Sequence, residues 1–177
     1  DFNFPMPIVD LIMSLLNRKR QAPTDKVDTS VREWFSQTRR AADTTTEVVT
    51  TTFQLPLSVS ELSLEILRMP CQVEIWYQDR SNNWRPVLDM QRSPLSVAVS
   101  LAETKSWFKY ESRCHPIVAK QLQFRLTRIP EPLLGDTPFP VGLRNCLIRR
   151  NVYDRSSGGA FEDQVDVMGN LITRYVK

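Results

Sequence analysis

The segment from Val73 to Trp84 constrains the fold most, because its side chains alternate in polarity. In an extended chain, Val73, Ile75 and Tyr77 fall on one face, and the more polar residues between them fall on the other. The alternation stops at Asp-Arg-Ser-Asn-Asn, a sequence rich in residues that tolerate turns. A second short apolar run then begins at Trp84. The segment therefore predicts a strand, a reversal of about five residues and a returning strand.

The same period of two extends from Glu47 to about residue 150, with no helical periodicity in between. It is clearest where Leu122, Phe124 and Leu126 point one way and Gln, Arg and Thr point the other. Further strand-like runs lie at 48–53, 62–67, 95–99, 107–110 and 141–148, and we expect the last of these to be the final strand. Short strands separated by turn signals predict a mainly β fold, an antiparallel β-sandwich of the jelly-roll type.

Residues 1–20 predict an amphipathic helix from Pro7 to Arg20. A helix this short is marginal on its own and needs a surface to pack against, either on its own domain or on a neighbouring protein. A second short helix is predicted around residues 31–38, with Val31, Trp34, Phe35 and Thr38 on one side. Its aromatic pair belongs either to the core or to a recognition surface. The candidate partner-binding residues are Ile8, Leu11, Ile12, Leu15, Leu16, Trp34 and Phe35.

Three regions follow from these patterns. Residues 1–46 form an N-terminal helical arm and linker, and residues 47–155 form the β-sandwich domain. The run Ser156 to Gly159 predicts a flexible joint, so 156–177 is a linker or a lead-in to a following domain. Because the chain starts at Asp1 and stops at Lys177 without an obvious ending, we expect it to be a segment of a longer polypeptide.

Composition limits the function. The 177 residues are 41% hydrophobic and 24% charged, as in a globular protein, and the net charge of +3 is too small and too scattered to predict nucleic-acid binding. No apolar run reaches the roughly 20 residues that span a bilayer, so we expect no membrane contact. The three cysteines lack metal-site spacing and predict buried, reduced thiols in a protein assembled in a reducing cytoplasm: Cys71, Cys114 and Cys146.

Nothing in the sequence suggests catalysis or a cofactor. His115, the one histidine, is adjacent to Cys114, and in a strand the two side chains would face opposite ways. Pro116 then suggests an extended approach to a loop. The loop beginning at Asp79 is the densest in oxygen-bearing side chains, but turns favour these residues for backbone reasons and a bound ion is the weaker alternative. With 5 glycines and no Gly-rich motif, no phosphate cradle is expected.

Surface recognition remains. Trp76 and Trp84 flank the predicted hairpin, and we expect both in the core of the sandwich. Tryptophan and arginine are common anchors of protein interfaces, and flat aromatic rings also bind sugars. The candidate ligand-loop residues are Trp107, Phe108, Phe139 and Arg144.

Three motifs in order give the chain a family likeness. The sequence YQDRSNNW, then AKQLQFRLTRIP, then VGLRNCLIRR resembles the discoidin-like, galactose-binding-like β-sandwich over roughly residues 47–150. The matching positions are Tyr77, Asp79 and Trp84, then Ala119, Leu122, Phe124 and Arg125, then Gly142, Leu143, Arg144 and Ile148. The family implies ligand binding by loops at one end of the sandwich, or a plain interaction module.

A narrower likeness concerns the later part of the chain. The sequences PFPVGLRNCLIRRNVYDR and GNLITRYVK are similar to segments of large virion structural proteins, or minor tail proteins, of tailed phages of actinobacteria. This resemblance implies a non-enzymatic structural module of the virion, assembled in the host cytoplasm, whose partners are other virion proteins in multiple copies. The alternative is a carbohydrate- or receptor-binding module that recognises a glycan of the host cell surface.

Overall fold

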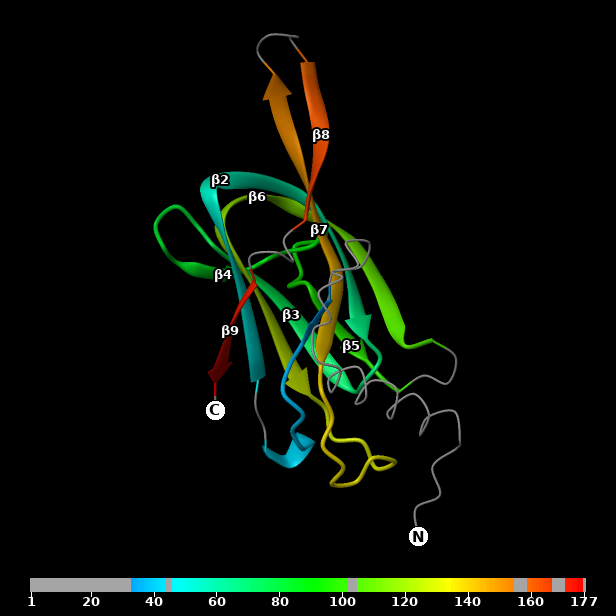
Figure 1. Cartoon of the computed structure of the whole chain (residues 1–177). Coiled ribbons are helices and arrows are strands. Elements are labelled where there is room, and N and C mark those ends of the chain that lie inside the picture. The colour runs from blue at the N-terminus through cyan, green and yellow to red at the C-terminus, as the bar shows by residue number, and fades with distance from the viewer. Residues whose placement is uncertain (1–32, 44–45, 102–104, 155–158, 167–170, 177) are drawn as a thin grey trace, which may run out of the picture.

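The structure is a computed structural model that describes residues 33–43, 46–101, 105–154, 159–166 and 171–176 (Figure 1). These residues form antiparallel strands and one short 3-10 helix. The prediction of a mainly β, antiparallel fold is confirmed. The elements are β1 (Glu33–Phe35), η1 (Ala41–Asp43), β2 (Thr46–Leu67), β3 (Cys71–Gln78), β4 (Trp84–Pro86), β5 (Ser96–Val99), β6 (Trp107–Arg128), β7 (Gly142–Asp154), β8 (Gly159–Asp166) and β9 (Leu171–Val176).

The hydrogen-bonded sheet has the order β1-β7-β2-β6-β3-β4, with β5 also on β3, β8 on β7 and β9 on β2. The predicted hairpin is confirmed, since β3 and β4 pair from Gln78 opposite Trp84 to Trp76 opposite Pro86. Two strands are much longer than predicted, because the separate runs at 48–53 and 62–67 both lie in β2, and those at 107–110 and 121–127 both lie in β6.

The long strands bend at irregularities instead of ending. In β2 the pairing with β6 shifts register between Thr52 and Leu57 and again between Val59 and Glu61. At the second shift, three residues of β6, 114–116, face a single residue of β2. His115 there donates its backbone N–H to the carbonyl of Leu88 at 2.8 Å. The expectation that His115 and Pro116 approach a loop is wrong, because a bulge tolerates the missing N–H of proline inside a strand.

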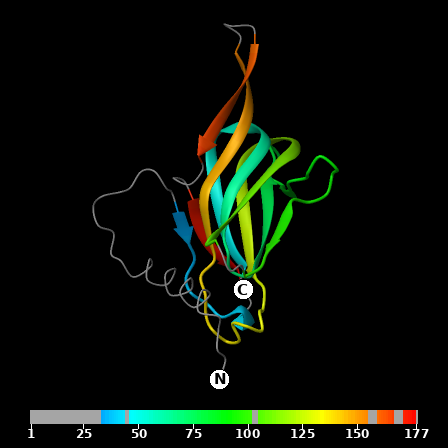
Figure 2. The same ribbon diagram turned by 90° about the vertical axis from the view of Figure 1, so that its right-hand side faces the viewer.

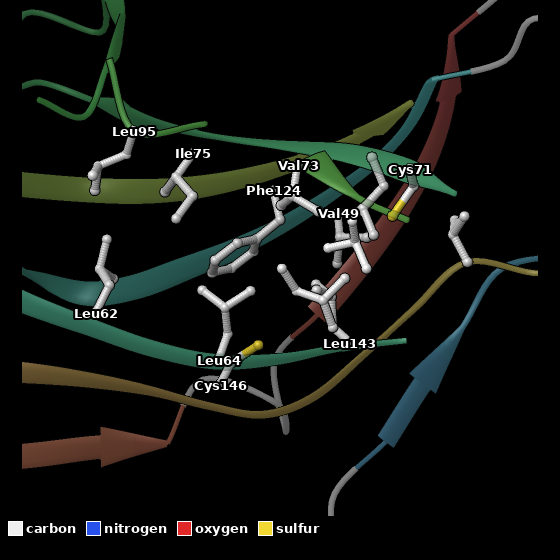
Figure 3. Packing of buried hydrophobic residues seen from close by; sticks show 14 of the residues in the cluster. Val49, Leu62, Leu64, Cys71, Val73, Ile75, Leu95, Phe124, Leu143 and Cys146 are labelled. Carbon is white, nitrogen blue, oxygen red and sulfur yellow. The ribbon is translucent and has the colours of Figure 1, made fainter. Parts of the chain in front are cut away.

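The hydrophobic core consists largely of buried side chains from β2, β3, β6 and β7, and Figure 3 shows part of it around Phe124. Leu122, Phe124 and Leu126 are almost fully buried, as their alternation predicts, and the residues between them are half-buried. Val73 and Ile75 of β3 face the same interior. Each such side chain contributes about 1.5–3 kcal/mol through its removal from water. The three cysteines are free and buried, so the prediction of buried thiols is confirmed.

The second predicted helix is wrong in the part that the structure describes. Residues 33–35 form strand β1, in which Trp34 pairs with Leu143 and Phe35 with Gly142 of β7. A Cβ atom on Gly142 would lie 2.8 Å from the Trp34 carbonyl oxygen and 3.0 Å from Cδ1 of Phe35, so glycine permits this close approach. A short helical pattern is weak, and the backbone bonds offered by a strand edge override it.

Beyond Ile148 the sheet continues, so the prediction that residues 141–148 form the last strand is wrong. Strand β7 extends to Asp154 and pairs with β8, and β9 pairs with the first part of β2. Figures 1 and 2 show the β7–β8 hairpin standing out from the rest of the sheet. The sequence of β8 contains one β-branched residue, Val165, which is why its strand signal was weak. The predicted helix at Pro7–Arg20 with its five docking residues, and most of the predicted joint at 156–159, lie outside the described residues.

Candidate binding surface

A surface hollow of about 600 Å³ lies where β2 ends and β6 begins, beside β7. We call it the Trp107 hollow. Three of the four candidate ligand-loop residues, Trp107, Phe108 and Arg144, line it together with the neighbours of Trp107 in the sequence, and the structure adds Arg68, which directly follows β2. Its full lining is Glu65, Arg68, Lys105, Ser106, Trp107, Phe108, Lys109 and Arg144.

Arg144 fixes one side of the hollow. Its guanidinium lies 5.2 Å from the centre of the Trp107 ring, within the range of a cation–π contact. Its Nε is 3.0 Å from Oε2 of Glu65, which makes an ion pair although the N–H is not aligned for a hydrogen bond. The Phe35 ring is tilted by 56° against Trp107 at 5.8 Å. Phe35, a candidate partner-binding residue, thus supports the hollow from β1.

Arg68 fixes the other side. Its Nε donates to the carbonyl oxygen of Trp107 at 3.0 Å, and its guanidinium lies 5.4 Å from the centre of the Phe108 ring. Lys109 is exposed and forms a 2.8 Å ion pair with Glu111, just outside the hollow. Trp107 is half-buried, and its indole N–H is buried with no hydrogen-bond acceptor among the described residues.

Phe139 lies elsewhere. Its side chain is 1% exposed, and the Arg128 guanidinium is 5.7 Å from its ring, so the ring cannot face a ligand in this structure. Arg128 donates to the Phe139 carbonyl at 3.0 Å, to Ser36 Oγ at 2.9 Å and to Glu47 Oε1 at 3.0 Å. This buried network ties residues 36–37 and the 129–141 connection to the end of the sheet. The period of two could have revealed it, since it places Glu47 with Val49, and Arg128 with Leu126, on the inward face.

The two hairpin tryptophans are not core residues. Trp76 and Trp84 are half-buried, and Trp76 lies on the outer face of β3 with the Arg125 guanidinium 4.0 Å from its ring centre. The Trp76 indole N–H donates to Glu74 at 3.2 Å. The expectation that both lie in the core is therefore wrong. The alternation of β3 places Trp76 on the face opposite Val73 and Ile75, which is correct, but the large apolar side chain of Trp76 suggested the interior.

The oxygen-rich loop is a turn. Oδ1 of Asp79 accepts the backbone N–H groups of Ser81 and Asn83, both at 2.9 Å, and Oδ2 accepts Nε of Arg85 at 2.9 Å. These bonds, with that from Asn83 first, hold the pKa of Asp79 below its ordinary value. The Asp79 carboxylate thus accepts hydrogen bonds within the turn and from Arg85 rather than facing a cation. In the described part of the chain, no three His, Cys, Asp or Glu side chains group as metal ligands do.

The same turn recurs ten positions later. Oδ1 of Asp89 accepts the N–H groups of Gln91 at 2.8 Å and Ser93 at 2.9 Å. Asn82 and Arg92, at equivalent places in the two turns, both have positive φ, 63° and 64°. The geometry of this second turn could not be read from the sequence, because arginine is not a residue that signals a positive φ.

The thiols and the histidine do not form a nucleophilic pair. Burial raises the pKa of Cys71 to about 12 and that of Cys114 to about 11, which disfavours the reactive thiolate. His115 is exposed while Cys114 is buried, as the predicted opposite orientation requires. His115 lines a smaller hollow of about 260 Å³ with Tyr77, Arg85 and four apolar residues.

Comparisons with known proteins give no relative. No family model, no curated protein and no solved structure matches the chain. Within the described residues, no helix has the length and apolar character needed to cross a membrane.

Proposed function

We propose that the chain is a non-enzymatic structural and interaction module of a tailed-phage particle, which contacts neighbouring virion proteins. The likeness of its motifs to the discoidin-like family and to virion proteins of actinobacterial phages suggests this class. On this proposal the sheet is a β-sandwich. Support comes from the pairing of β2, whose residues 46–51 lie between β6 and β9 and whose residues 61–66 lie between β6 and β7, with core side chains between the two parts (Figure 3).

The observation that carries the proposal is the protruding β7–β8 hairpin (Figure 1). Residues 147–149 of β7 pair with both β8 and β2, whereas residues 150–154 pair with β8 alone. A two-stranded ribbon has unpaired backbone groups along its edges, and such edges readily accept a strand or loop of another chain. A neighbouring subunit that covers this hairpin gains backbone hydrogen bonds without requiring any change in the sheet.

A shortened hairpin tests the proposal. Asn151 and Glu162 face each other across the pair, so residues 152–161 are replaced by Asn-Gly, which closes a tight turn. We expect an unchanged far-ultraviolet spectrum and the loss of incorporation when the chain is co-expressed with the other proteins of its particle. Deletion of residues 1–20, the predicted docking helix, should have the same effect. Met90→Ser, at an exposed turn, is the control. Normal incorporation of both truncated proteins would refute the proposal.

One observation favours the alternative, a carbohydrate- or receptor-binding module. Trp107, Phe108 and Arg144 line the same hollow, as residues of a ligand site would. This alternative predicts saturable binding to a host-surface glycan on an array, with loss of binding in Arg144→Gln. Phe139→Leu, a change in a buried side chain outside the hollow, should leave that binding intact.

A further inference from the structure

We propose that the Trp107 hollow binds a carboxylate-rich segment of a partner protein, with Arg68, Lys105 and Arg144 as the groups that contact its carboxylates. This inference rests on the proposed function, because it supplies the chemistry of one neighbouring subunit. It concerns a different surface from the β7–β8 hairpin, so the two are tested separately.

The charge of the hollow is the first argument. Four cationic side chains line it, and Glu65 is the one acidic side chain among them. Glu65 is used by Arg144, and Lys109 is neutralised by Glu111. Arg68 and Lys105 have no carboxylate within ion-pair distance among the described residues. An excess of positive charge in a hollow with apolar walls attracts anionic groups and raises their local concentration.

The second argument is that both guanidinium groups are held in place. Arg68 is held through its Nε by the Trp107 carbonyl and by the Phe108 ring. Arg144 is held by Glu65 and the Trp107 ring. In each case the inward contact uses Nε, which donates a hydrogen bond in Arg68 and makes only an ion pair in Arg144, and no other hydrogen bond of either side chain is present among the described residues. The outer N–H groups therefore present a fixed fork, which matches the two oxygens of a carboxylate at little cost in side-chain entropy.

The aromatic contacts distinguish the class of ligand. A sugar or a nucleobase needs an open ring face on which to stack. The Trp107 ring is contacted by Phe35 and by the Arg144 guanidinium, and Arg68 lies over the Phe108 ring. These rings thus orient the arginines rather than offer stacking faces. A binding surface built in this way favours side-chain carboxylates over neutral sugars and bases.

The test uses the purified full chain and a short peptide of alternating glutamate and serine, measured by titration calorimetry at low salt. We expect saturable binding that weakens as ionic strength rises. The double variant Arg68→Gln/Lys105→Gln should bind about tenfold more weakly, the loss of roughly one charge-assisted hydrogen bond. Lys105→Glu, a change on an exposed side chain that leaves the Arg68 bond in place, should also weaken binding.

The matched control removes the same charge elsewhere. Arg92 and Lys120 are exposed and lie outside the hollow, so Arg92→Gln/Lys120→Gln should bind the peptide as the parent does. Equal weakening in the two double variants would show general charge attraction and overturn the proposal. So would absence of peptide binding, or tighter binding of a uronic-acid oligosaccharide or of DNA under the same conditions.

The outcome is separable from that of the proposed function. If the hollow variants lose peptide binding but both truncated proteins are incorporated into particles normally, the carboxylate site stands and the proposed docking role of the hairpin and the N-terminal segment falls. If the peptide fails to bind but the hairpin is required for incorporation, this inference alone is lost.

Discussion

The guanidinium of Arg128 and the carboxylate of Glu47 lie 3.0 Å apart, and neither side chain is exposed. Their strands β2 and β6 are neighbours in the sheet, and the pair is completed by hydrogen bonds from Arg128 to Ser36 and Phe139. A buried charge is tolerable only when its partners are all present. The pair therefore determines how residues 36–37 and the connection before β7 close the end of the sheet.

Removal of one partner should be costly. We expect Arg128→Met to lower the free energy of unfolding by about 3–5 kcal/mol, because the buried Glu47 is left with only the longer contact to Arg39, at 3.8 Å. Urea unfolding followed by tryptophan fluorescence measures this. The double variant Arg128→Met/Glu47→Leu should recover part of the loss. Equal stability of the single variant and the parent would contradict the buried pair.

The twin turns give a test with an internal control. Arg92 has φ of 64°, a conformation that is costly for arginine and free of strain for glycine. Arg92→Gly should therefore raise stability by about 1 kcal/mol. Asn82→Gly, at the equivalent position with φ of 63°, should change it little because asparagine tolerates this region. A gain at Asn82 larger than at Arg92 would be inconsistent with strain as the cause.

Asp79 should contribute to the acid sensitivity of the fold. Its pKa is lowered in the folded state, first by the Asn83 N–H and then by Arg85, so the unfolded chain binds a proton more readily. The stabilising contribution is present above the unfolded pKa, about 3.9, and is lost as pH falls through the lower folded value. Thermal melts of Asp79→Asn between about pH 6 and 2 should decline less steeply than those of the parent. The pKa values of Asp43 and Glu111 are also lowered in the folded state, so part of the loss of stability at acid pH should remain in the variant.

The cysteines should be inert in the folded protein. Burial raises the pKa of Cys71 to about 12 and of Cys114 to about 11, and Cys146 is 1% exposed. Ellman's reagent at pH 8 should react slowly with the native chain and fully after denaturation. Rapid reaction of a native thiol would show that its strand opens. If the rapid reaction disappears in Cys114→Ser, the strand opens at the bulge in β6.

Local alternation was sufficient for the parts of the fold that depend on one strand. It placed Ile75 and Phe124 in the core and located the hairpin after β3, because period two decides which face is buried. It failed for β1, where a strand edge far along the sequence overrode a helical pattern. It also failed for the lengths of β2 and β6. A bulge inside a strand carries no distinctive turn residues, so the sequence does not distinguish one long, bulged strand from two short strands.

For the candidate site, residue type indicated Trp107, Phe108 and Arg144, and the topology brings them together. Arg68 was missed, since only the pairing of the end of β2 with the start of β6 brings it beside Trp107, whereas Lys105 is already a neighbour of Trp107 in the sequence. Phe139 was expected at a ligand loop, but a proline-rich connection gives no sign of which side chain it turns inward. The burial of Arg128 was also not expected, because arginine side chains are usually exposed.

The bulge at residues 114–116 gives the sheet its continuity. Strand β2 pairs with β9 in its first part and with β7 in its last, and β6 pairs with β2 along both parts, so the two long strands join these portions of the described sheet. We expect a disturbance at the start of β2, where it pairs with β9, to be transmitted along the same strand to its far end, where it pairs with β7. We therefore expect that a force applied to the protruding hairpin would be distributed along the full length of the two long strands.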